Sequence, residues 1–96
     1  MQRPPLKSAM RAQADRKRIA EFYAEEASPL VAFEVLADIK SATDKIKKNL
    51  LAYRTGKRIG TRELVMRRFQ YVLVYRILPN RITVLRVLHQ ARRYFN

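Results

Sequence analysis

The chain has 96 residues, 48% of them hydrophobic, which suffices for one hydrophobic core, and we expect a single domain over residues 1–96. Cysteine is absent and histidine occurs once, so neither a disulfide framework nor a zinc site is expected, and we expect no metal and no other cofactor. No apolar run approaches the roughly 18 residues of a membrane span, and the N-terminus lacks the pattern of a secretory signal. We therefore expect a cytoplasmic protein with no membrane partner.

The positive charge is concentrated in the second part of the chain. The formal net charge is +13, yet residues 1–44 carry seven basic and seven acidic side chains, which cancel. Residues 45–96 carry fourteen basic side chains against one acid, Glu63. This asymmetry suggests a nucleic acid or an acidic protein as partner. The alternative is a solvated surface that only keeps the protein in solution.

The N-terminal part predicts a short strand followed by a helix. Pro4 and Pro5 exclude a helix at the start, and residues 6–10 could form a short edge strand. Residues 12–26 are predicted to be helical, because their apolar side chains recur every three or four positions. This face consists of Ala12, Asp15 or Arg16, Ile19, Phe22 and Tyr23.

Ser28 and Pro29 mark the start of a second helix. Serine is a preferred N-cap, and proline is favoured at the first helical position. The helix is predicted to run to about Leu50, and a tight break before it makes the two helices an antiparallel hairpin. Its apolar stripe is Ala32, Leu36, Ile39, Thr43, Ile46 and Leu50, with Phe33 and Val35 beside it.

The remaining residues predict a loop and three strands. Residues 52–60 are read as a loop, and residues 62–67, 70–78 and 81–89 as strands. The last two strands are apolar on both faces, which is typical of central strands. On the last strand, we expect Ile82, Val84 and Leu88 on one face and Leu85 and Val87 on the other. The fold class is therefore α+β, with a helical hairpin packed on one face of a small, mainly antiparallel sheet, in the order β-α-α-β-β-β.

Three segments resemble the RelE/ParE superfamily of toxins from bacterial type II toxin–antitoxin systems. They are G-T-R-E-L-V at 60–65, Y-V-L-V-Y-R at 71–76 and V-L-R-V-L-H-x-A-R-x-Y at 84–94, the last being the most specific. Ala12, Asp15 and Ile19 also match the pattern of the first helix in this superfamily. Arg16 stands where a leucine is usual, and the proline-rich start differs from the usual apolar strand.

The resemblance implies one of two toxic activities. RelE-like members are ribosome-dependent ribonucleases that cut messenger RNA, whereas ParE-like members poison DNA gyrase. The second and third strands and the C-terminal segment are more similar to the ParE branch. The resemblance thus implies a gyrase-inhibiting toxin that is not an enzyme and forms a hetero-oligomer with a cognate acidic antitoxin. The alternatives are a RelE-like endoribonuclease acting on ribosome and mRNA, and a small basic nucleic-acid-binding domain without toxicity.

The candidate site residues are basic or aromatic and lie mostly near the C-terminus. Arg76 and Arg86 interrupt apolar strands, so each must reach solvent, pair with an acid or face a groove. If the protein is a ribonuclease, general acid–base work falls to His89 and Tyr94, and phosphate binding to Arg76 and Arg92. No acid neighbours His89 in the sequence, which favours a binding surface over a nuclease site. The candidates for binding a target or partner are Arg62, Arg76, Arg86, His89, Arg92, Arg93 and Tyr94.

Overall fold

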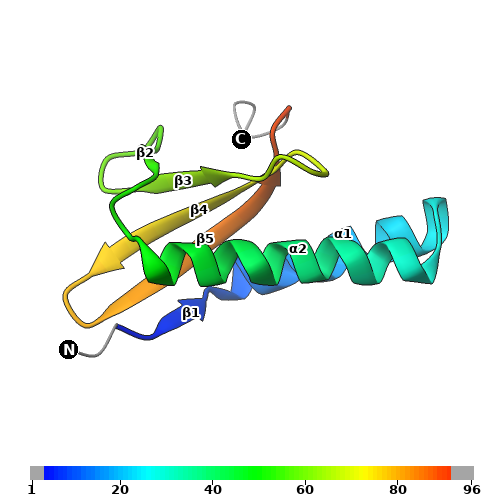
Figure 1. Cartoon of the computed structure of the whole chain (residues 1–96), viewed down its shortest axis with the longest axis horizontal. Helices are drawn as coiled ribbons and strands as arrows, with labels where there is room; N and C mark the ends of the chain where they lie inside the picture. The colour runs from blue at the N-terminus through cyan, green and yellow to red at the C-terminus, as the bar shows by residue number, and fades with distance from the viewer. Residues whose placement is uncertain (1–3, 92–96) are drawn as a thin grey trace.

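The computed structural model describes residues 4–91 and contains two helices and five strands in that range (Figure 1). The elements are β1 (Leu6–Ser8), α1 (Met10–Glu26), α2 (Pro29–Lys48), β2 (Arg54–Thr55), β3 (Arg62–Val65), β4 (Tyr71–Leu78) and β5 (Arg81–His89). The predicted α+β fold and its element order are confirmed. One expectation is corrected, because the segment read as a loop contains β2, which pairs antiparallel with β3.

The five strands form one sheet in the order β1-β5-β4-β3-β2. Strand β1 lies parallel to β5, with Leu6 opposite Ile82, and all other neighbours are antiparallel. The sheet is therefore mainly antiparallel, as predicted, and β1 occupies one of its edges. The long strands β4 and β5 form its centre, as expected of strands that are apolar on both faces.

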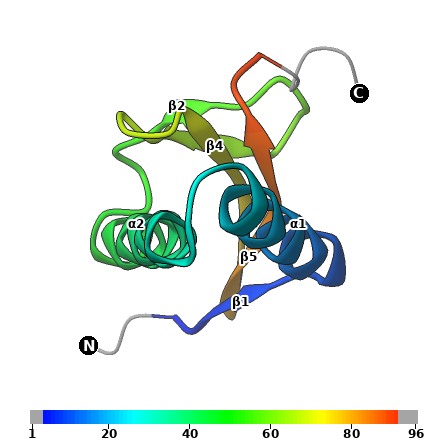
Figure 2. The ribbon, with the colours of Figure 1, turned by 90° about the vertical axis from the view of Figure 1, so that its right-hand side faces the viewer.

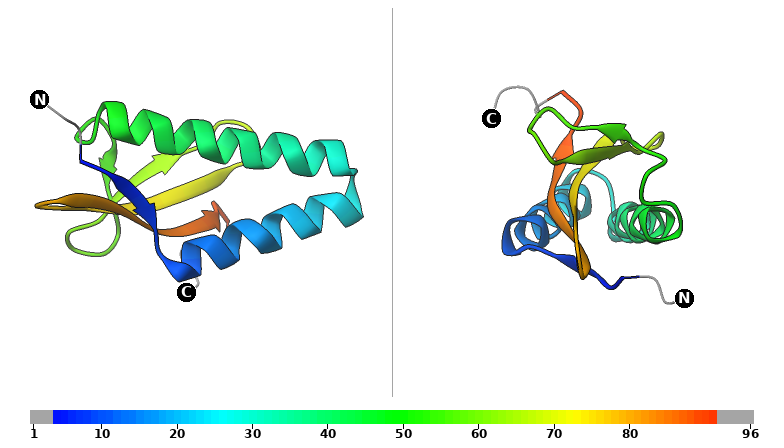
Figure 3. Two further views of the ribbon diagram at one scale, coloured as in Figure 1. Left: turned by 90° about the horizontal axis from the view of Figure 1, so that it is seen from below. Right: turned by 90° about the vertical axis from the view of Figure 1, so that its left-hand side faces the viewer.

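Both helices cover the same face of the sheet, as Figures 2 and 3 show. The connection between them projects beyond the sheet along the longest axis of the molecule (Figure 1). Between helices and sheet lies the core, whose largest fully buried side chains are Tyr75, Ile39, Ile46, Leu73, Ile82, Val35, Val72 and Val84. Neither helix is long and apolar enough to cross a membrane.

Helix α2 begins as the sequence predicts but buries a slightly different stripe. The Ser28 hydroxyl accepts a hydrogen bond from the Val31 amide at 3.1 Å, and Pro29 is the first helical residue. The buried residues of this helix are Ala32, Val35, Ile39, Ala42 and Ile46. Leu36 and Leu50 pack only at the margin of the core, and Phe33 is 72% exposed. The predicted stripe was therefore wrong at these positions, because the face of α2 that is buried is rotated slightly about the helix axis relative to the predicted apolar stripe.

A β-bulge in β5 shifts the pattern of buried residues on that strand. Val74 lies opposite Arg86, but the next residue, Tyr75, lies opposite Val84, so Leu85 is the extra residue. A bulge of this kind moves the following side chains to the other face. As a result, Val87 is buried and Leu88 only half-buried, which reverses the prediction for these two residues.

Tyr75 joins the centre of the sheet to the end of the helical hairpin. Its side chain is fully buried, and its hydroxyl donates a 2.6 Å hydrogen bond to the carbonyl oxygen of Leu50. Burial raises the pKa of Tyr75 above its usual value of 10.0. The folded protein therefore holds the phenol proton more tightly than the unfolded chain does.

Arg16 carries a polar atom without a partner. It is half-buried on α1, and its Nε is buried with no hydrogen-bond partner among residues 4–91. A buried donor without an acceptor destabilises the folded state. This is the position at which related sequences were expected to have leucine.

The first prediction concerns Tyr75→Phe. Losing the hydrogen bond to Leu50 should lower the free energy of unfolding at pH 7 by about 1 kcal/mol. Because the pKa of Tyr75 is raised in the folded state, its stabilising contribution is complete below pH 10.0 and is lost as the pH rises further. Urea unfolding should therefore show a weaker loss of stability above pH 10.0 in Tyr75→Phe than in the wild type. Tyr23→Phe is the matched control, and equal slopes for Tyr75→Phe and wild type would contradict the prediction.

The second prediction concerns Arg16. Lysine keeps the charge and the length of the side chain but places a methylene group where arginine has Nε. Arg16→Lys and Arg16→Leu should both raise the free energy of unfolding by about 1 kcal/mol, because both remove the unpaired donor. Denaturant unfolding measures the change, with the exposed Arg11→Lys as control. A loss of stability in both Arg16 variants would show that the guanidinium is satisfied in solution.

Candidate functional site

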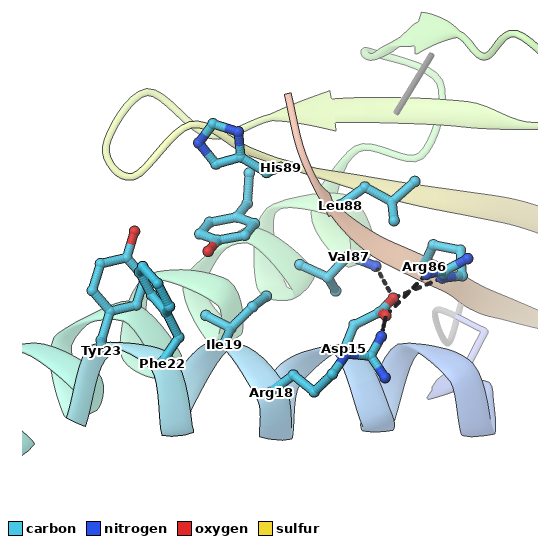
Figure 4. Close-up of a pocket in the computed structure, with 10 residues that line it drawn as sticks. Asp15, Arg18, Ile19, Phe22, Tyr23, Arg86, Val87, Leu88 and His89 are labelled. Atoms are coloured by element: carbon cyan, nitrogen blue, oxygen red, sulfur yellow. Dashed lines mark hydrogen bonds and ion pairs between the residues drawn. The ribbon is translucent and has the colours of Figure 1, made fainter. Parts of the chain in front are cut away.

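A groove of about 530 Å³ lies between the C-terminal half of α1 and the end of β5 (Figure 4). One of its ends is charged and the other is aromatic. The lining residues are Asp15, Arg18, Ile19, Phe22, Tyr23, Tyr71, Arg86, Val87, Leu88 and His89. Of the seven residues proposed from the sequence, Arg86 and His89 lie in this groove.

Asp15 organises the charged end of the groove. The carboxylate is only 3% exposed and accepts four hydrogen bonds, two on each oxygen. Arg86 donates to it with Nε at 2.8 Å and Nη2 at 3.1 Å. The backbone amide of Val87 donates at 2.9 Å, and the mostly exposed Arg18 donates at 2.6 Å. The buried charge is thus fully paired, which is the condition under which a carboxylate is tolerated in a core.

The pairing explains why an arginine interrupts the apolar strand β5. Arg86 follows directly after the bulge at Leu85, and its side chain reaches Asp15 on α1. The hydrogen bond with Asp15 raises the pKa of Arg86 above its usual value, so the guanidinium stays charged. Arg86 was expected to reach solvent, pair with an acid or face a groove. In the structure it pairs with Asp15 and also lines the groove.

Aromatic rings form the other end of the groove. Tyr23 of α1 contacts Phe22, Phe69 and Tyr71 in edge-to-face geometry, with ring centroids 5.1, 5.4 and 6.5 Å apart. The ring of His89 stands edge-on to Tyr71 at 5.4 Å. Edge-to-face pairs of this kind stabilise beyond the area that they bury. The rings therefore form a firm apolar wall that continues from α1 to the end of β5.

The turn between β3 and β4 supports this wall with a strained backbone. Phe69 and Gln70 have φ angles of 65° and 57°, the left-handed region that bulky side chains rarely adopt. The Gln70 carbonyl accepts from the Gln90 amide at 2.8 Å, and the Met66 amide donates to the Tyr71 carbonyl at the same distance. Packing of Phe69 on Tyr23 and these hydrogen bonds hold the turn in place.

His89 has no acidic partner among the described residues. Its Nδ1 accepts a 3.3 Å hydrogen bond from the Ala91 amide, and its ring packs on Tyr71. Asp15 is the one carboxylate that lines the groove, and it bonds to Arg18, Arg86 and Val87 instead. A general base of this type is usually oriented by a third group, whereas the described contacts of the His89 ring are with Tyr71 and the Ala91 amide.

The other predicted site residues lie elsewhere or outside the described part of the chain. Arg62 donates to the carbonyl of Tyr53 at 2.8 Å and lines a second hollow beside the β2–β3 loop. The half-buried Arg76 lies near that loop too, with Nε 3.8 Å from where a Cβ would stand on Gly60. The structure therefore does not bring Arg62 and Arg76 together with His89. Arg92, Arg93 and Tyr94 lie outside the described residues 4–91.

Sequence reasoning did not identify Asp15 as a site residue. The signal available was a carboxylate on the predicted apolar face of α1, where a charge needs a partner. Its partner on β5 could not be chosen without the fold. Within residues 4–91, no three His, Asp or Glu side chains gather in a way that could hold a metal ion.

The third prediction tests Asp15. Asp15→Asn removes the charge that Arg86 pairs with and should lower the free energy of unfolding by about 3 kcal/mol. Arg18→Ala should cost less than about 1 kcal/mol, because Arg18 is 66% exposed. The double variant Asp15→Asn/Arg86→Met should recover part of the loss, since it leaves no buried charge unpaired and Arg18 is mostly exposed. Urea unfolding measures all three, and an Asp15→Asn variant as stable as Arg18→Ala would refute the assignment.

Comparison with known proteins gives a consistent result. The sequence matches the family described as "ParE toxin of type II toxin-antitoxin system, parDE" over residues 6–94. Among solved structures, the fold is similar to a chain of the "Chromosomal ParDE TA system from P. aeruginosa", with a TM-score of 0.83 and 25% identity. That alignment covers 90% of this chain and 95% of the other. No curated protein matches the chain. Because the family match spans nearly all of the sequence, the chain belongs to the ParE toxin family of type II toxin–antitoxin systems.

Proposed function

We propose that this ParE-family toxin binds and inhibits DNA gyrase, and that a cognate acidic antitoxin neutralises it. The observation that carries the proposal is the family match over residues 6–94. Its structural relative belongs to a system described as ParDE, which pairs a toxin with an antitoxin. Gyrase acts on the chromosome, so the toxin acts in the cytoplasm.

The geometry of the groove supports a binding toxin over a messenger ribonuclease. His89 lies against an aromatic ring and has no carboxylate partner in the described chain. Of the arginines proposed to bind phosphate, Arg76 lies beside the β2–β3 loop, away from His89, and Arg92 lies outside the described residues. A toxin that acts by binding needs no general base. The groove therefore favours the ParE-like activity.

The charge and the groove together fit an acidic antitoxin segment. Residues 45–96, which contribute β2 to β5, carry fourteen basic side chains and one acidic side chain. Arg18 lies beside an aromatic and aliphatic wall, so a segment with alternating acidic and apolar side chains fits both. Such a segment can be disordered alone and fold on binding. Arg62, Arg76, Arg86, His89, Arg92, Arg93 and Tyr94 are the candidate contacts for antitoxin or target.

The fourth prediction tests the target. Purified toxin should inhibit supercoiling by purified gyrase and increase cleaved DNA, and adding the antitoxin from the neighbouring reading frame should restore supercoiling. Induction in growing cells should reduce DNA synthesis before protein synthesis and produce filaments. Untouched supercoiling, together with an immediate stop of translation and codon-phased cuts in messenger RNA, would instead establish the ribonuclease.

A further inference from the structure

The tip of the helical hairpin is acidic in an otherwise basic protein. Residues 19–39 contain five acids and no lysine or arginine, whereas the whole chain carries +13. This segment is the C-terminal end of α1, the connection and the first half of α2, and its connection projects beyond the sheet (Figure 1). The acids are Glu21, Glu25, Glu26, Glu34 and Asp38.

Large apolar side chains are exposed in the same segment. Phe22 is 54% exposed, Leu30 68% and Phe33 72%. Leu30 and Phe33 are three positions apart and therefore share a face of α2. We call Glu21, Phe22, Glu25, Glu26, Leu30 and Phe33 together the hairpin tip.

The acids of the hairpin tip do not stabilise the helix that carries them. Glu25 and Glu26 lie in the last turn of α1, which has no basic residue and where the helix dipole disfavours negative charge. Within residues 4–91, none of Glu21, Glu25 and Glu26 takes part in an ion pair. Their charge is therefore unused inside the molecule and available to a basic partner.

The other end of the molecule presents a surface of the opposite character. Ile59, in the loop between β2 and β3, is 98% exposed, and the neighbouring Arg58 is exposed as well. A hollow of about 300 Å³ beside them is lined by Thr55, Gly56, Arg58, Ile59, Gly60, Thr61, Arg62 and Ile77. We call residues 56–61 the basic loop; it lies at the opposite end of the 41 Å long axis from the hairpin tip (Figure 1).

The basic loop has a fixed shape. The Gly56 amide donates to the Thr61 carbonyl at 2.7 Å, and the Thr61 hydroxyl donates to the Arg58 carbonyl at 2.6 Å. A Cβ on Gly56 would stand 2.2 Å from the Thr61 hydroxyl, so only glycine fits there. Gly60 has a φ of 81°, which also favours glycine. The hydrogen bonds of this turn therefore fix the backbone at Ile59 and keep its side chain exposed to solvent.

We propose that the hairpin tip of one copy docks on the basic loop of a second copy, head to tail. The carboxylates of the tip meet Arg58, and Phe22 and Phe33 cover Ile59. The two surfaces lie at opposite ends of one molecule, so each copy can use both, and the contact is heterologous and can continue into chains or rings. Two copies carry the same net positive charge and repel each other. At physiological salt this repulsion is screened over about 8 Å, a distance much shorter than the 41 Å molecule, so the attraction between the acidic tip and the basic loop in contact outweighs it.

The fifth prediction is a complementation test by sedimentation velocity on the full chain. The average mass of the wild type should rise above the 11.3 kDa monomer as its concentration increases. The tip variant Glu25→Gln/Glu26→Gln/Phe33→Ser and the loop variant Arg58→Gln/Ile59→Ser should each remain monomeric. An equimolar mixture of the two should form a species of twice the monomer mass, because one intact tip and one intact loop remain.

Two controls separate this contact from other causes. Ala14→Lys/Ser41→Lys makes the same change in net charge as the tip variant at exposed positions elsewhere, and it should still associate. The tip variant should melt no lower than the wild type, because its charge change relieves the unfavourable helix end. A wild type that stays monomeric at every concentration would overturn the proposal, as would a loop variant that associates by itself. Neither outcome bears on the inhibition of gyrase, which is measured separately.

Discussion

The buried carboxylate of Asp15 fixes helix α1 against strand β5. It accepts four hydrogen bonds, two of them from Arg86 and one from the backbone of Val87, and so joins α1 to β5 at one place. A buried charge is costly unless all its lone pairs are used, and any slip of the helix along the strand would leave two charges unpaired. The pair therefore sets the position of the helix on the sheet. That position in turn decides that the aromatic residues of α1 meet those of β4 and β5, which forms the groove.

The groove is held from its other end by a second constraint that is local. The β3–β4 turn places Phe69 and Gln70 in the left-handed region, at a cost that the contact of Phe69 with Tyr23 and the hydrogen bond from Gln90 offset. The charged end thus depends on hydrogen bonds, and the aromatic end on packing. Because both constraints involve α1, a partner that fills the groove meets a preformed surface, which lowers the entropic cost of its binding.

Much of the fold could be predicted from the pattern of apolar residues in the sequence, whereas the candidate site could be predicted only in part. The periodicity of apolar residues and the Ser28–Pro29 break were sufficient to predict the two helices, because each signal depends only on residues close together in the sequence. The bulge at Leu85 could not be predicted, since no glycine marks it, and it exchanges the roles of Val87 and Leu88. The sequence indicated that Arg86 needed a partner, yet the choice of Asp15, 71 residues away, is a tertiary contact.

In the two proposals, an antitoxin segment occupies the groove and a second copy docks on the hairpin tip, and one residue belongs to both surfaces. Phe22 lines the groove and also belongs to the hairpin tip, where it is 54% exposed. An antitoxin segment that fills the groove as far as Phe22 would cover it, and a second copy docked on the tip would cover it too. Neutralisation also lowers the net positive charge and with it the repulsion between copies, but that effect is screened over about 8 Å. Direct competition for Phe22 is therefore the stronger effect, and the neutralised toxin should associate with itself less than the free toxin does.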